Sequence, residues 1–365
     1  MSTLPPKSVW RDGDVIKIQW LDDAPNYPGN HTTSLSIATL RSLLKHGNAN
    51  TWPSYAPSPR KAWEAEEYAQ FSDFDYEAYM NDDQVLSQAL TQLHTHGLLF
   101  VSNVPESETS VSTIGERIGP IKNTFYGYTW DVRSVPKAKN VAYTSQDLGF
   151  HMDLLYMEQP PQIQLLHCIR SSSSGGASLF TDSYKAAADL LAADVDTFKT
   201  LVDVEASFHY NHPDSNLYHQ SRPVFEVLEK DYRQTFRALY NDKPVNILDY
   251  LTAVNWSPPF QAPFAVKPRH RQQQSKTEVL GPLNSRVADW HKAAQQFNAL
   301  VHRPSGIYER LMKPGECVIF DNRRVLHARK AFEAGDAGKE RWLRGAYLDK
   351  DPYLSKMRVL HGAAK

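Results

Sequence analysis

The sequence has few cysteines, no long hydrophobic run and almost no net charge. Only two of its 365 residues are cysteines, Cys168 and Cys317, and both lie in apolar runs, which favours buried free thiols and excludes a cysteine-rich zinc module. No apolar run approaches the ~20 residues of a membrane span, and the N-terminus lacks the apolar segment of a secretory signal. The net charge is −1, without a long basic block. We therefore expect a cytoplasmic protein with neither nucleic acid nor a membrane as its partner.

The length of the chain favours one large domain with a smaller one attached to it. Near the N-terminus, residues 15–20 alternate as a strand does, residues 34–46 have helical spacing, and a stretch rich in Pro, Ser and Asn follows. We therefore place a small N-terminal module at residues 1–72 and the main domain at residues 73–365.

The main domain begins with helical patterns and continues with short β-rich runs. The first helical pattern has Asn81 or Asp82 as its N-cap and ends at Gly97. From about residue 140 onward, β-rich runs alternate with turns. Helical patterns lie at residues 81–96, 109–118, 183–191 and 287–299. This succession of helical patterns and β-rich runs predicts an α+β fold with a jelly-roll core and flanking helices.

A His-x-Asp pair, His151 and Asp153, lies in an otherwise apolar stretch. Buried ionisable groups need a partner or a metal, which raises the question of a metal site. In a strand, residues two apart point to the same face, so both side chains would face one way. The pair alone is common by chance, and a metal site needs a third ligand.

His327 supplies that ligand if its strand runs antiparallel beside the His-x-Asp strand. Two histidines and one carboxylate on one face, with three positions left open, form the facial triad of non-haem Fe(II) oxygenases. Arg341 begins the next predicted strand, where a guanidinium would clamp the far carboxylate of 2-oxoglutarate while the keto acid end chelates the iron. The order of these residues predicts an oxygenase that uses Fe(II), 2-oxoglutarate and O2.

Three other interpretations stay open. A lone histidine on an apolar strand is usually structural, and a cupin-like barrel would carry such a ligand set by accident. A zinc hydrolase would use similar ligands but would not need Arg341. A binding module with a degenerate barrel would keep the fold without turnover.

The chain resembles the gamma-butyrobetaine dioxygenases of the taurine-dioxygenase-like superfamily. The similarity extends over residues 73–362 and is densest at residues 124–184 and 314–351. It implies a double-stranded β-helix core, a small-molecule substrate and a homodimer. The residues that match the iron ligands are His151, Asp153 and His327, and those that match the 2-oxoglutarate pocket are Arg341 and Leu166. No other residue is implied to be catalytic.

The resemblance also implies an aromatic cage for a quaternary ammonium group. Such a cation donates no hydrogen bond, so it is held by the quadrupoles of aromatic rings. The matching positions are all aromatic in this sequence: Tyr126, Trp130, Tyr143 and Tyr347. Packing in the core is the usual role of a Tyr or Trp, and it is the alternative for each residue. Aromatic residues at all four positions favour the cage.

Several positions depart from the family pattern. The animal members carry clustered cysteines that bind zinc, whereas this chain has no cysteine before Cys168, so we expect no zinc site and a truncated N-terminal module. Asn140 keeps a polar substrate contact, but Arg344 replaces an acidic residue near the substrate pocket, and residues 231–250 form an insertion. These differences concern the end of the substrate away from the ammonium group.

Two hypotheses about the reaction follow. The first is hydroxylation of gamma-butyrobetaine to L-carnitine, a step of carnitine biosynthesis. The second keeps the chemistry but changes the substrate to another amino acid, betaine or fungal-type secondary metabolite, with desaturation or ring closure as possible outcomes. The catalytically silent binding module is the further alternative, and iron-dependent succinate production separates it from both.

Overall fold

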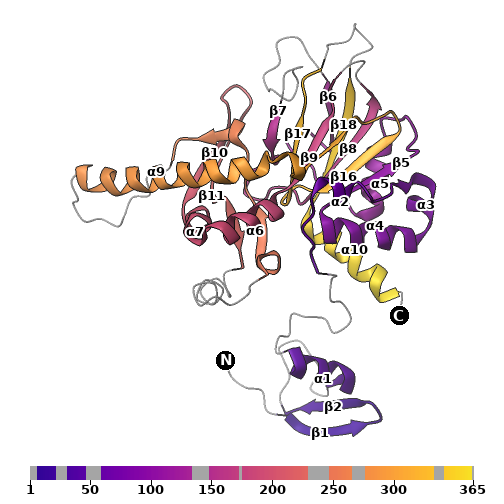
Figure 1. The fold of residues 1–365 in the computed structure, drawn as a ribbon. Coiled ribbons are helices and arrows are strands. Elements are labelled where there is room, and N and C mark those ends of the chain that lie inside the picture. The colour runs from indigo at the N-terminus through magenta and orange to yellow at the C-terminus, as the bar shows by residue number, and fades with distance from the viewer. Residues whose placement is uncertain are drawn as a thin grey trace. The chain divides into compact units, whose positions relative to one another are not determined.

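The computed structural model describes residues 6–21, 31–46, 59–133, 148–171, 175–228, 246–264, 276–332 and 341–363 (Figure 1). Contacts divide the chain into two compact units, Met1–Pro57 with His361–Lys365, and Ser58–Leu360. Residues 59–72, which the sequence places in the N-terminal module, therefore group with the larger unit. The reason is that Trp63 and Tyr68 are buried in its hydrophobic core.

The smaller unit contains an antiparallel three-stranded sheet followed by a helix. Its strands β1, β2 and β3 pair in that order, and helix α1 follows: Pro6–Asp12, Val15–Trp20, Thr32–Ser36 and Ile37–His46. The strand predicted at residues 15–20 is confirmed. The helix begins three residues later than expected, because Ser34 and Ser36 pair with Lys17 and Val15 of β2.

The larger unit contains two main sheets. The six-stranded sheet has the order β4-β5-β16-β8-β18-β6 and is antiparallel except between β4 and β5. These strands are, in that order, Phe74–Asp75, Leu98–Ser102, Glu316–Asp321, Ile163–Arg170, Trp342–Leu348 and Thr129–Arg133. The four-stranded antiparallel sheet has the order β15-β9-β17-β7: Ile307–Arg310, Ser178–Asp182, Val325–Arg329 and Leu148–His151.

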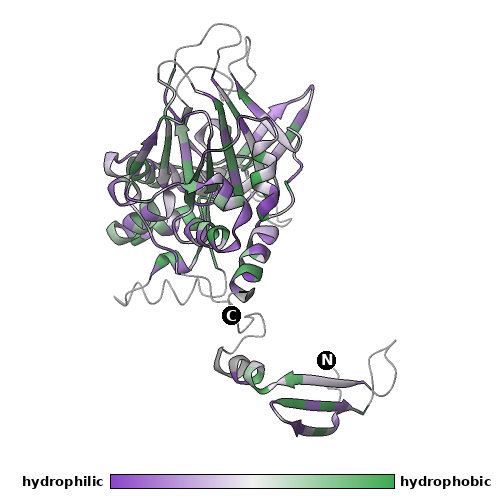
Figure 2. Ribbon diagram, turned by 90° about the vertical axis from the view of Figure 1, so that its right-hand side faces the viewer, coloured by the Kyte–Doolittle hydropathy of each residue, from purple (hydrophilic) through white to green (hydrophobic). Residues whose placement is uncertain are grey.

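Part of the hydrophobic core lies between these two sheets. Phe180 on β9 meets Phe100 on β5 and Phe320 on β16 edge to face, with ring centroids 5.8 and 5.7 Å apart. Figure 2 shows the strands of this region as mostly hydrophobic and the surrounding helices as mixed. The predicted α+β fold with flanking helices is confirmed.

Helices cover the sheets on the outside. Helices α4 and α5 contact the six-stranded sheet, whereas α6, α7 and α9 pack on one another (Figure 1). The first group and its neighbours are α2 (Ala65–Tyr68), α3 (Tyr76–Asn81), α4 (Asp83–His96), α5 (Ser110–Ile118) and α10 (Lys350–Ala363). The second group is α6 (Ser183–Ala193), α7 (Val195–Asp203) and α9 (Lys276–Val301). Helix α9 is longer than the pattern at residues 287–299 predicted.

Smaller elements complete the unit. The β10–β11 hairpin pairs with β14, and β12 pairs with β13: Glu205–His212, Asn216–Pro223, Gln261–Ala262, Phe225–Val227 and Leu251–Val254. Short 3₁₀ turns lie at Ile247–Asp249, Pro258–Phe260 and Pro304–Gly306. The predicted insertion at residues 231–250 falls largely outside the described residues.

The predicted ends of α4 are confirmed. The Asp82 side chain accepts hydrogen bonds from the backbone N–H groups of Gln84 and Val85, as an N-cap does. Gly97 adopts a left-handed conformation with φ of 79°, which glycine reaches at no steric cost. Thus the sequence determines where this helix begins and ends.

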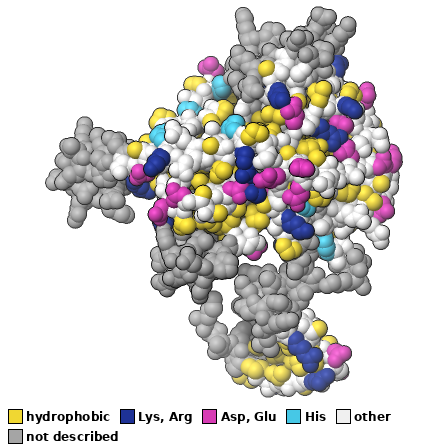
Figure 3. Space-filling model, viewed as in Figure 1, with side chains coloured by type: hydrophobic (Ala, Val, Ile, Leu, Met, Phe, Trp, Pro, Cys, Tyr) yellow, Lys and Arg dark blue, Asp and Glu magenta, His cyan; other side chains and the backbone are white. Residues whose placement is uncertain are grey.

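Charges of both signs are interspersed with hydrophobic side chains on the face shown in Figure 3. None of the helices in the described part of the chain combines the length and the hydrophobicity that a membrane crossing requires.

Candidate metal centre

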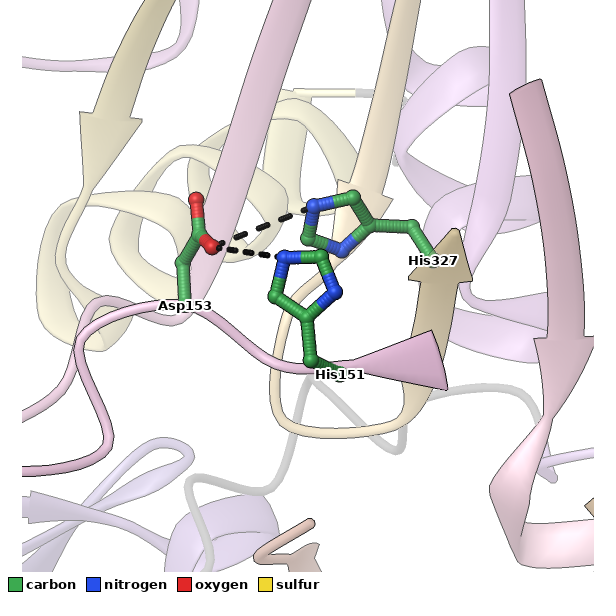
Figure 4. A group of neighbouring side chains, drawn as sticks. All are labelled: His151, Asp153 and His327. Carbon is green, nitrogen blue, oxygen red and sulfur yellow. Dashed lines mark ion pairs between the residues drawn. The ribbon is translucent and has the colours of Figure 1, made fainter. Parts of the chain in front are cut away.

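The two histidines of the predicted triad lie on neighbouring strands. His151 ends β7, and His327 lies directly opposite to it on the antiparallel strand β17. Their ring centroids are 4.2 Å apart. The antiparallel pairing expected from the sequence is therefore confirmed, and it brings both imidazoles to one point (Figure 4).

Asp153 reaches the same point, but not by the strand alternation that the sequence suggested. Strand β7 ends at His151, and the chain then turns, with Leu154 at a φ of 58°. The Met152 N–H donates to the carbonyl of Trp256, and the Asp153 N–H donates to Oδ1 of Asn322. These bonds hold the turn, so the position of Asp153 depends on residues that are distant in the sequence.

The three side chains form one ligand set. Asp153 Oδ1 lies 3.3 Å from His151 Nε2 and 3.9 Å from His327 Nε2 (Figure 4). One ligand atom from each residue lies within 4.8 Å of the other two. His151 Nδ1 lies 2.8 Å from the carbonyl oxygen of Gly149, so a proton on Nδ1 leaves Nε2 free for a metal.

The pKa shifts of His327 and Asp153 also suit a metal. Burial lowers the pKa of His327 to about 3, and the charge of His151 acts in the same direction. Burial raises the pKa of Asp153, but the hydrogen bond with His151 and the charges of both imidazoles outweigh burial and lower it overall. Neutral imidazoles and an ionised carboxylate are the forms that bind a metal. Two histidines and one carboxylate with open positions are the donor set of non-haem Fe(II) oxygenases.

Further side chains bind the second carboxylate oxygen of Asp153. Its Oδ2 accepts hydrogen bonds from the Tyr347 hydroxyl at 2.6 Å and from Gln164 Nε2 at 2.8 Å. Burial raises the pKa of Tyr347, and the charge of Asp153 raises it further, so the hydroxyl stays protonated. Asn322 Nδ2 donates to the Asp153 carbonyl at 3.1 Å, whereas neighbouring Asp321 accepts from Gln162 instead.

A cavity is lined by this centre and by two arginines. Arg341 and Arg329 are both buried, and their guanidinium groups lie 5.7 and 4.8 Å from the ring centre of Phe332. Burial lowers the pKa of Arg341 to about 10, and the charge of Arg329 contributes. Within the described part of the chain, no carboxylate lies within ion-pairing distance of Arg341. A buried guanidinium that faces a cavity fits the far carboxylate of 2-oxoglutarate. Leu166 lines the same cavity.

Three of the four predicted cage residues line this cavity, namely Tyr126, Trp130 and Tyr347. Trp130 and Tyr347 stack directly, with ring centroids 3.9 Å apart and an angle of 15° between the planes. Tyr126 lies 6.4 Å from Trp130. The Tyr347 ring therefore covers one face of the Trp130 ring. Tyr143 lies outside the described residues.

Two other predicted substrate residues are not brought to the cavity by the described structure. Arg344 points to the opposite face of β18, where it donates to Asp131 Oδ1 at 2.8 Å and to Thr129 Oγ1 at 3.0 Å. The alternation of the strand explains this, because Arg344 is an odd number of residues from Tyr347. Asn140 lies outside the described residues.

Sequence reasoning missed several residues of the site. Gln164 is a polar residue within an apolar strand, and Arg329 is two residues beyond His327 on β17, so both carried a signal. Tyr156 and Phe260 also line the cavity, and their rings lie 5.1 Å apart. Nothing in the sequence near Phe260 marked it, because its element packs there through long-range contacts.

Comparison with known proteins identifies the same class of enzyme, a dioxygenase, as the geometry of the site does. The family described as taurine catabolism dioxygenase TauD, TfdA family matches residues 54–347. Dioxygenase str8 of Strobilurus tenacellus is 36% identical over 95% of this chain and 74% of its own length. Human gamma-butyrobetaine dioxygenase is 28% identical over 80% of this chain and 67% of its own length.

A solved structure of asparagine oxygenase with Fe(II), hydroxyasparagine and succinate has a similar fold. The match has a TM-score of 0.51 and a sequence identity of 18%, and it covers 74% of this chain and 82% of the asparagine oxygenase chain. With His151, Asp153 and His327 in place, this chain belongs to the TauD, TfdA family of Fe(II)- and 2-oxoglutarate-dependent dioxygenases.

Proposed function

We propose that this dioxygenase hydroxylates an unactivated C–H bond of a small substrate, and that gamma-butyrobetaine, which would give L-carnitine, is the first candidate. The observation that carries the proposal is the aromatic wall of Tyr126, Trp130 and Tyr347 along the cavity that contains the triad. Aromatic faces attract quaternary ammonium groups, which form no hydrogen bonds as donors. The relationship to gamma-butyrobetaine dioxygenase supports the same candidate.

The residues of the chain would act by binding and placement. His151, Asp153 and His327 would hold Fe(II), and Arg341 would hold 2-oxoglutarate, with Leu166 against it. Bound Fe(II) with 2-oxoglutarate and O2 would supply the oxidising power, with succinate and CO2 as the co-products. The aromatic wall would fix one end of the substrate, so that one carbon lies beside the metal. Such placement dominates the rate of the reaction.

A second candidate is a different substrate with the same chemistry, such as another amino acid, a betaine or a fungal-type secondary metabolite. Two observations favour it. The arginines among the described lining residues are Arg329 and Arg341, and they lie together beside Phe332, where 2-oxoglutarate would bind. The carboxylate of gamma-butyrobetaine would therefore have no separate arginine among these residues. The 36% identity with fungal Dioxygenase str8 also covers nearly the whole chain. Desaturation or ring closure then joins hydroxylation as a possible outcome.

The test is to load purified protein anaerobically with Fe(II) and 2-oxoglutarate and then to add O2 and gamma-butyrobetaine. Carnitine by mass spectrometry and succinate are measured in parallel. Carnitine equal to succinate supports the first candidate, whereas substrate-stimulated succinate only with other compounds supports the second. Trp130→Ala should raise KM for the substrate, while Tyr128→Ala, an exposed residue two positions away, serves as the control.

The family resemblance also supports the proposal of a homodimer in the cytoplasm. Light scattering on the purified protein measures its mass in solution, and a mass of one chain would contradict the dimer.

A further inference from the structure

We propose that Tyr347 and Gln164 are positioning residues of the metal centre, because they hold one oxygen of Asp153 so that only the other faces the metal. This inference depends on the metal centre and not on the identity of the substrate. It gives Tyr347 a role that differs from the substrate cage predicted from the sequence.

The hydrogen bonds divide the two carboxylate oxygens between two tasks. Oδ2 accepts from the Tyr347 hydroxyl at 2.6 Å and from Gln164 Nε2 at 2.8 Å. Oδ1 instead lies 3.3 Å from His151 Nε2 and 3.9 Å from His327 Nε2. Both donors occupy Oδ2, so Oδ1 is the atom presented to the metal.

The two donors are rigidly placed. Tyr347 and Gln164 are each 1% exposed, and they lie directly opposite one another on the paired strands β18 and β8. The Tyr347 ring stacks on Trp130 at 3.9 Å. Their burial leaves little access for water to replace a lost hydrogen bond. Removing either donor should therefore leave Oδ2 of Asp153 with one hydrogen bond fewer.

This arrangement matters because a carboxylate binds a metal through one oxygen or through both. The facial triad leaves three positions open on the metal only when the carboxylate uses one oxygen. By engaging Oδ2, Tyr347 and Gln164 would keep the third open position from being taken by Asp153. Partners of metal ligands typically change metal affinity about 10- to 100-fold when they are removed.

Tyr347→Phe is the direct test, because it keeps the stacked ring and removes only the hydroxyl. Apo protein is titrated with Co(II), whose visible absorption reports its ligands and their geometry. We expect about a tenfold higher Kd and an altered visible band, with no change in the melting temperature of the apo protein. Tyr128→Phe is the control, because it also removes a tyrosine hydroxyl, but from a side chain that is 63% exposed. It should keep the wild-type Kd and band.

Gln164→Leu provides a second route to the same measurement if Tyr347→Phe does not fold. It removes the other donor, and we expect the same direction of change in Kd and in the visible band. The double variant should show the largest change, because Oδ2 then has neither donor. Wild-type Co(II) affinity and spectrum in the folded variants would overturn the proposal. A raised KM for the substrate with an unaltered metal centre would give Tyr347 the cage role alone.

Discussion

Arg341 carries a buried charge that an anionic ligand would neutralise. Its guanidinium is buried, and burial lowers its pKa to about 10, a cost that an anionic ligand would offset. We predict that Arg341→Met weakens 2-oxoglutarate binding about 10- to 100-fold, the size of a lost charge-assisted contact. Anaerobic titration of the Fe(II) protein with 2-oxoglutarate measures this. Arg344→Met is the control, because Arg344 lies on the opposite face of β18 and bonds to Asp131. Equal weakening in both variants would contradict the assignment.

His167 makes the stability of the protein depend on pH. It is fully buried on β8, and burial lowers its pKa to about 4. The unfolded chain takes up a proton near pH 6.5 but the folded chain does not, so the free energy of unfolding should fall as the pH drops from 6.5 towards 4. One such group contributes at most about 1.4 kcal/mol per pH unit.

Urea denaturation of apo protein at about pH 7 and about pH 5 tests this, with His167→Leu beside the wild type. The variant should lose less stability between the two pH values, while His96, whose pKa burial also lowers to about 4, keeps part of the effect in both. An identical loss in both proteins would show that His167 does not titrate in this way.

At the scale of the element, β18 connects the metal centre with the aromatic wall. Gly345 lies opposite Trp130 of β6, and a Cβ at Gly345 would come 2.3 Å from the Trp130 indole. We predict that Gly345→Ala displaces the indole from Tyr347 and costs about 1–3 kcal/mol of stability, as overpacking does. Urea denaturation measures the cost. Gly149→Ala on β7 is the control, because no atom lies within 4 Å of an added Cβ there. An equal cost for both substitutions would refute the steric explanation.

At the scale of the larger unit, a buried ion pair connects segments that are far apart in the sequence. Arg324, before β17, donates to both carboxylate oxygens of Asp182 at the start of α6, and to the carbonyls of Thr95 and Lys61. Asp182 also accepts from the Trp63 N–H. This network holds residues 61–63 to the core, which is why they belong to the larger unit.

We predict that Arg324→Met costs about 3–5 kcal/mol of unfolding free energy, because it leaves Asp182 buried without its cation. The double variant Arg324→Met with Asp182→Asn should regain part of this loss, since the uncompensated charge is gone. Urea denaturation of the three proteins gives the comparison. If the double variant were as unstable as the sum of the two single variants, the pair would not be coupled.

The sequence by itself determined the chemistry and the local elements. His151, Asp153 and His327 identify a facial triad through residue type and order, and the cap and stop of α4 at Asp82 and Gly97 are local signals. Short β-rich runs also indicated strands of the two main sheets. These features depend on neighbouring residues along the chain, so they can be predicted without a structure.

Only the tertiary structure decided how the ligands are held. Asp153 leaves the strand and is fixed by Asn322, Gln164 and Tyr347, and Arg344 turns away from the cavity. Each of these facts depends on the register between strands that are distant in the sequence, and a shift of one residue would reverse every face. Long-range packing sets that register, which is why the ligands could be named from the sequence while the side chains that orient them could not.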